Sequence, residues 1–275
     1  MSLDPELLAL LDPAPAIEKA PIEAARAAQR EETARLAGTG PEVDHVRDDT
    51  VDGVPVRVYE PSEHAGTLVY FHGGGWALGD LDSVDALCRR LANESRTRVV
   101  SADYRLAPEH PFPAGFEDAL TVARGADADV VAGDSAGANL AAGAARHLRD
   151  RIRLQLLVYP VTDAGGDRSA EPYGLSAADM QRFWRLYGAD PTHPDASPMR
   201  ADDLAGAPPA YVITASHDVL RAEGEAYAAA LERAGVPVTL TCVEGTIHGF
   251  WRYQSLEIAR RTVREAALAV RAAIG

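Results

Sequence analysis

The segment Val130–Leu140, with the sequence VVAGDSAGANL, constrains the fold of this chain more than any other. It is typical of a buried apolar strand, a Gly-x-Ser-x-Gly turn and the start of a helix. Gly133 and Gly137 have no side chain, so the backbone can cross itself closely at these two positions. Such a turn would present Ser135 to a substrate, close to the free N–H groups of the helix start. Taken alone, the five-residue pattern suits an ordinary glycine-containing turn equally well.

A second glycine-rich motif follows the short apolar run Thr67–Phe71. This run, a predicted strand, ends at His72-Gly73-Gly74-Gly75-Trp76, where three consecutive glycines leave several backbone N–H groups exposed. N–H donors held ready for an oxyanion stabilise the transition state of acyl transfer. A phosphate-binding loop is the alternative, but no Gly-Lys-Ser or Gly-Lys-Thr follows and the spacing is not that of a dinucleotide site.

Together these motifs resemble the hormone-sensitive-lipase-like esterases, in which an HGGG loop lies upstream of a GDSAG turn. Ser101–Ala114, SADYRLAPEHPFPA, also matches a characteristic segment of that family. The resemblance covers nearly the whole chain. It implies the α/β-hydrolase fold, an α/β architecture with a mostly parallel central sheet, flanking helices and a helical cap.

The other members of a catalytic triad are found from the chain order of α/β-hydrolases, which is serine, then an acid, then histidine. Asp218 follows the apolar run Tyr211–Ala215, and His248, the only histidine beyond it, follows the predicted strand Val238–Val243. Singly, Asp218 could cap a helix and His248 could be a solvated loop residue. Jointly, and in this order after Ser135, they are typical of a triad.

The predicted chemistry gives each residue a role. His248 removes the proton of Ser135 and returns it to the leaving group, while Asp218 orients the imidazole. The oxyanion is held by the N–H groups of Ala136 and of the Gly73–Gly75 loop, in which Gly73, Gly74 and Gly75 are all candidates.

Two further polar residues near these motifs are expected to act structurally. Asp134 precedes the nucleophile, and a hydrogen-bonding role that supports the strained turn is favoured over a direct electrostatic role. The family resemblance implies that His72 braces the oxyanion loop.

Length and pattern indicate a single catalytic domain over residues 1–275. Helical runs at Ser83–Ser95, Ala136–Arg149 and Arg221–Ala234 alternate with short apolar runs, which predicts βαβ units and parallel strands. Val54–Val58 would be an earlier antiparallel strand if the family topology holds.

Two segments, at about residues 1–40 and 164–207, do not fit this alternation and are predicted to form the cap. Aromatic residues in the second segment are candidates for substrate binding, although they could equally pack the cap against the core. Trp76, Phe250 and Trp251 lie nearer the predicted chemistry and are better candidates for shaping the acyl or alcohol pocket. Together the candidates are Trp76, Phe183, Trp184, Tyr187, Phe250 and Trp251.

The formal charge is −14, from 41 acidic and 27 basic side chains, which disfavours binding to nucleic acids or anionic membranes and favours neutral substrates. No signal peptide or membrane-spanning run is evident. Cys88 and Cys242, both in segments expected to be buried, suggest free thiols in the cytoplasm. The chain has no cluster of residues at metal-ligand spacing, so we expect no metal and no cofactor.

The sequence therefore predicts a serine carboxylesterase that hydrolyses small, neutral esters. The family resemblance implies the preference for short acyl chains and allows a homodimer formed through an edge of the sheet. A metabolite-specific deacetylase or amidase with the same triad is an alternative. A ligand receptor on a hydrolase fold is a third reading, but the receptors that resemble this family lack the triad histidine.

Overall fold

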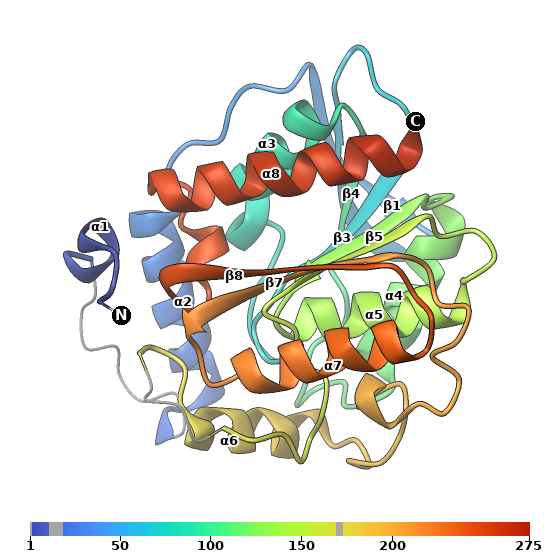
Figure 1. The fold of residues 1–275 in the computed structure, drawn as a ribbon. Coiled ribbons are helices and arrows are strands. Elements are labelled where there is room, and N and C mark those ends of the chain that lie inside the picture. Colours follow the sequence, from blue (N-terminus) through green and yellow to red (C-terminus); the bar gives the residue numbers. More distant parts are fainter. Residues whose placement is uncertain (1, 11–18, 169–172) are drawn as a thin grey trace.

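The structure is a computed structural model that describes residues 2–10, 19–168 and 173–275 (Figure 1). Its described residues form one eight-stranded sheet with the order β1-β2-β4-β3-β5-β6-β7-β8. β2 pairs antiparallel with β1 and β4, and all other neighbours are parallel. The strands are β1 (His45–Val51), β2 (Val54–Glu60), β3 (Thr67–Phe71), β4 (Arg98–Ala102), β5 (Val130–Asp134), β6 (Leu154–Val158), β7 (Ala210–His217) and β8 (Val238–Ile247).

Helices cover both faces of the sheet. Figure 1 shows α3 and α8 on one face and α4, α5 and α7 on the other. Two hydrophobic clusters fill the spaces between these helices and the sheet. The helices are α1 (Pro5–Leu8), α2 (Ile22–Leu36), α3 (Asp85–Ser95), α4 (Ala114–Gly125), α5 (Ala136–His147), α6 (Ala177–Tyr187), α7 (Arg221–Arg233) and α8 (Glu257–Ile274), with short 3₁₀ turns at η2 (Asp82–Val84), η3 (Pro198–Arg200) and η4 (Phe250–Arg252).

The central strands are apolar throughout because both of their faces are covered. Every residue of β3, β5 and β6 is buried. This pattern is typical of parallel strands with helices on both sides. Parallel pairing also brings the carboxyl ends of β3, β5, β6, β7 and β8 to one edge of the sheet, where ligand sites of open α/β sheets form.

The predicted α/β-hydrolase architecture is confirmed in its sheet and flanking helices. The predicted strand at Val54–Val58 is part of β2 and is antiparallel to β4, as expected. The predicted helix at Ser83–Ser95 begins as the turn η2 and continues as α3. The expectation that both cysteines are buried is wrong for Cys242, which is half-buried because it lies in the edge strand β8.

The helix α2, in the first segment predicted as cap, is bound to loops of the catalytic body. Arg26 donates hydrogen bonds to the carbonyls of Ala77 (2.9 Å) and Ala107 (3.1 Å) and forms an ion pair with Glu109 (2.7 Å). The first predicted cap segment is described except for residues 1 and 11–18, and the second except for residues 169–172. None of the helices in the described ranges has the length and apolar character needed to cross a membrane.

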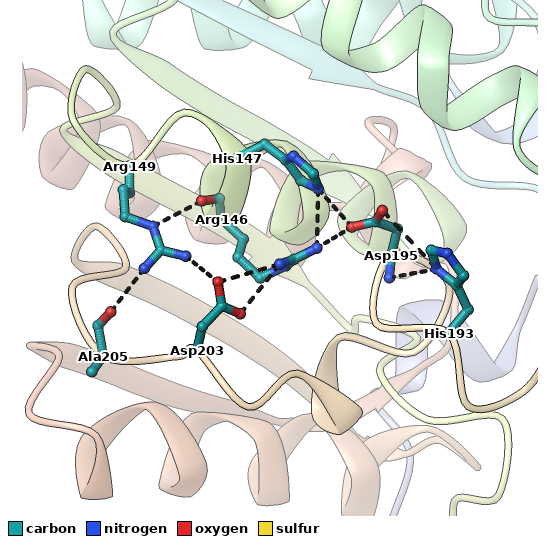
Figure 2. A network of polar contacts seen from close by, with 7 residues as sticks. All are labelled: Arg146, His147, Arg149, His193, Asp195, Asp203 and Ala205. Carbon is teal, nitrogen blue, oxygen red and sulfur yellow. Dashed lines mark hydrogen bonds and ion pairs between the residues drawn. The ribbon is translucent and has the colours of Figure 1, made fainter.

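A polar network binds the second predicted cap segment to the end of α5 (Figure 2). Arg146 forms ion pairs with Asp195 and Asp203, and His147 Nε2 lies 2.8 Å from Asp195. Arg149 adds a second ion pair to Asp203 at 2.6 Å. The helix that begins after Ser135 is therefore anchored at its other end to the chain between α6 and β7.

Candidate active site

The turn between β5 and α5 requires glycine on both sides of Ser135. A Cβ on Gly137 would lie 1.9 Å from the carbonyl oxygen of Phe71, and a Cβ on Gly133 would lie 2.4 Å from the Gly137 carbonyl. Ser135 has φ 56° and ψ −119°, a strained backbone conformation for a residue with a side chain. The close crossing of β3, β5 and α5 holds this conformation in place.

Ser135, His248 and Asp218 form a continuous hydrogen-bonded chain. The Ser135 hydroxyl lies 2.9 Å from His248 Nε2, and His248 Nδ1 lies 2.8 Å from Asp218 Oδ2. Asp218 is buried, and its other oxygen accepts a hydrogen bond from the amide of Leu220. The carboxylate is thus fixed in place, and it orients the imidazole so that Nε2 can accept the serine proton.

The glycine loop after β3 lies beside the nucleophile turn, but its three amides are not equivalent. The Gly73 N–H donates to Asp134 Oδ1 at 2.8 Å, so it already has an acceptor. Within the described part of the chain, the amides of Gly74 and Gly75 donate no hydrogen bond. Gly73 is therefore removed from the candidate oxyanion donors, which leaves Gly74, Gly75 and Ala136.

His72 is completely buried behind this loop. Its Nδ1 lies 2.9 Å from the carbonyl oxygen of Gly73, and its ring stacks on Tyr104 with 4.5 Å between centroids. The Tyr104 hydroxyl donates to the main-chain carbonyl of His72 at 2.8 Å. Burial lowers the pKa of His72, so the ring stays neutral and Nδ1–H donates to the Gly73 carbonyl. These contacts suit a residue that braces the loop.

Comparisons with known proteins agree with this geometry. Residues 68–252, which contain the glycine loop and all three members of the hydrogen-bonded chain, match the model of a family described by the alpha/beta hydrolase fold. The chain belongs to the α/β-hydrolase family.

Several relatives of this hydrolase are named as ester hydrolases or esterases. It is 37% identical to ethyl acetate hydrolase of Pseudomonas putida over 93% of this chain and 94% of that protein. It is 41% identical to carboxylic ester hydrolase LipN of Mycobacterium tuberculosis over 72% of this chain, which spans 61% of that protein. Among solved structures, an esterase of Pyrobaculum calidifontis superposes with a TM-score of 0.89 at 37% identity, covering 99% of this chain and 100% of that one. These relatives confirm the predicted carboxylesterase family.

Four of the six candidate substrate-binding residues join α6 to the glycine loop, three of them through ring contacts with one another. The Trp76 ring is stacked on Tyr187 with 4.1 Å between centroids and lies 4.8 Å from the ring of Trp184. Phe183 packs directly on Gly75, where an added Cβ would lie 2.2 Å from the ring. The hydrolase therefore places an aromatic surface of α6 against its candidate oxyanion donors.

The other two candidates lie elsewhere. Phe250 and Trp251 have no exposed surface and belong to the hydrophobic cluster on the α3 and α8 side of the sheet. Phe250 contacts Tyr159 beside the site, with ring centroids 5.9 Å apart.

Tyr159 is a site residue that sequence reasoning missed. It directly follows β6, at the same sheet edge as Ser135, and its ring lies 4.6 Å from the His248 ring. Its hydroxyl is 3.4 Å from Asp134 Oδ2. Burial, followed by the charge of Asp134, raises the pKa of Tyr159 well above its usual value, so the hydroxyl remains a donor. Its position at a strand end was the only signal in the sequence.

Proposed function

We propose that this hydrolase cleaves small, uncharged carboxylic esters with short acyl chains. Ser135 attacks the acyl carbonyl while His248 accepts its proton, and the protonated imidazole then passes that proton to the alcohol leaving group. Water attacks the acyl-enzyme by the same route in reverse. The observation that carries the proposal is the unbroken chain of hydrogen bonds from Ser135 through His248 to Asp218.

The oxyanion is proposed to bind to the amides of Gly74, Gly75 and Ala136. A donor of this kind contributes about 3 to 4 kcal/mol to transition-state stabilisation. Ala136 is the first residue of α5, so the partial positive charge of the helix start supports the same site.

The preference for small esters is proposed from the surroundings of the nucleophile. Phe183 packs on Gly75, and the buried rings of Trp76 and Tyr187 stack on each other at the end of the glycine loop, which favours a compact acyl group. The net charge of −14 disfavours anionic substrates. Ethyl acetate, after which one relative is named, is an ester of this class.

The test is hydrolysis of p-nitrophenyl esters from acetate to palmitate by the wild type and by Ser135→Ala. We expect turnover with the short acyl chains, and a loss of at least about a thousandfold in Ser135→Ala. Turnover that survives the substitution would contradict the assignment of the nucleophile. A maximum at palmitate would contradict the compact acyl site, and amide substrates cleaved faster than esters would point to the amidase alternative.

We also propose that α2 and α6 belong to a cap over this site, within a single domain of residues 1–275. A homodimer through β8 is proposed because β8 is an edge strand that leaves Leu240 43% exposed. Light scattering after size-exclusion chromatography would detect it. The free thiols of Cys88 and Cys242 support a cytoplasmic location.

A further inference from the structure

One buried carboxylate, that of Asp134, touches several parts of the site and is itself 1% exposed. Its Oδ1 accepts hydrogen bonds from the Gly73 amide and the Tyr70 hydroxyl, both at 2.8 Å. Its Oδ2 faces the Tyr159 hydroxyl at 3.4 Å. Because Asp134 is bonded directly to Ser135, the same side chain sets the position of the glycine loop relative to the nucleophile.

The positive charge that faces this carboxylate comes from Arg252, four residues after His248. The Arg252 Nε lies 3.7 Å from Asp134 Oδ2 and has no hydrogen-bond partner among the described residues. The side chain is 15% exposed. The guanidinium lies close to Gly249, where an added Cβ would be 3.2 Å from Nη2.

We infer that Arg252 is a positioning residue for the oxyanion loop, acting through Asp134; this inference rests on the proposed esterase function. A buried carboxylate is stable only with donors and an opposite charge close to it. Arg252 is the ion-pair partner of Asp134 among the described residues. Without it, Asp134 would recruit water or turn toward other donors, and the hydrogen bond to Gly73 would weaken.

The consequence for catalysis follows from the order of the peptide units. The Gly73 amide directly precedes the peptides that carry the Gly74 and Gly75 N–H groups, so its hydrogen bond to Asp134 limits how those peptides rotate. Oxyanion donors stabilise the transition state more than the bound ester. A loosened loop should therefore lower kcat and leave KM nearly unchanged. Arg252 thereby links the histidine loop, the nucleophile turn and the oxyanion loop.

The experiment is a double-mutant cycle measured with p-nitrophenyl acetate. We expect Arg252→Gln and Asp134→Asn each to lower kcat by at least about tenfold, with KM within about twofold of the wild type. If Arg252 acts through Asp134, the double variant should be no slower than the slower single variant. Arg264→Gln is the matched control, because Arg264 forms an exposed ion pair with Glu257 on α8. It should retain wild-type kcat.

A second readout separates positioning from a general loss of stability. Trifluoromethyl ketones form a tetrahedral oxyanion with the active serine, so their affinity should fall in parallel with kcat in Arg252→Gln. Arg252→Lys keeps the positive charge and should restore part of both quantities. If Arg252→Gln does not fold, the cycle is measured with Arg252→Met, which also removes the charge.

Two results would overturn the inference. One is a kcat of Arg252→Gln equal to that of the wild type, and the other is fully additive losses in the double variant. An inactive wild type would instead contradict the proposed esterase function, so the two failures are distinguishable.

Discussion

The buried carboxyl of Glu223 should make the stability of the protein depend on pH. It lies in the first turn of α7, is 4% exposed, and accepts a hydrogen bond from the Thr162 amide at 2.8 Å. Its other oxygen pairs with Arg168 at 2.8 Å. These contacts bind the segment after β6, which leads into the second predicted cap segment, to the helix that follows Asp218.

Burial raises the pKa of the Glu223 carboxyl from its usual 4.5 to about 7, with Arg168 and the backbone amides opposing this effect. The folded protein therefore holds this proton more tightly than the unfolded chain does. Between pH 4.5 and about 7 the folded state binds more protons, so the free energy of unfolding falls as the pH rises through this window. At about 1.4 kcal/mol for each pH unit, the loss attributable to Glu223 reaches about 3 kcal/mol.

The assay is urea unfolding followed by tryptophan fluorescence at several pH values from 5 to 8, for the wild type and Glu223→Gln. Glutamine has no proton to exchange, so the stability of the wild type relative to the variant should decline up to about pH 7 and then stay level. Thr162→Val is the control, because the Thr162 hydroxyl donates to the Glu223 main-chain carbonyl at 2.9 Å. Removing this hydrogen bond should lower the free energy of unfolding by about 1 kcal/mol at every pH. A difference between wild type and Glu223→Gln that is constant, or that grows with pH, would refute the reasoning.

Two further substitutions test the close contacts at the site. Gly137→Ala places a methyl group 1.9 Å from the Phe71 carbonyl, so we expect a loss of at least about 3 kcal/mol in the free energy of unfolding, measured by denaturation, or no folded protein at all. A stable Gly137→Ala would show that β3 and α5 can separate. Phe183→Ala removes the ring that packs on Gly75, so we expect the acyl-chain preference to move toward longer p-nitrophenyl esters. An unchanged preference would place the acyl site away from α6.

Local patterns and chain order were sufficient to place the three loops of the proposed triad at the ends of their strands. The turn around Ser135, and the loops of Asp218 and His248 after successive strands, lie where the alternation of strands and helices predicts. Parallel strands explain this success, since they deliver their following loops to one edge of the sheet whatever the details of packing.

Contacts between residues far apart in the chain could not be predicted in this way. The acceptor of the Gly73 amide is Asp134, 61 residues away, so sequence alone left Gly73 among the oxyanion donors. Trp251 lies three residues after His248, yet its side chain belongs to the hydrophobic cluster between the sheet and helices α3 and α8. Nearness in sequence to a catalytic residue does not fix which face of the sheet a side chain reaches.

The GDSAG segment positions the glycine loop as well as the nucleophile. Gly133 and Gly137 allow the main chain of β3 to lie against α5, which brings the end of β3 close to the nucleophile. That closeness lets the Asp134 carboxylate reach the first amide of the glycine loop, while Ser135, the next residue, reaches His248. The carboxylate at position 134 thus serves to hold the glycine loop by accepting the Gly73 hydrogen bond, and this role requires no proton transfer. A longer side chain would displace the loop, and an apolar one would leave the Gly73 amide without its acceptor.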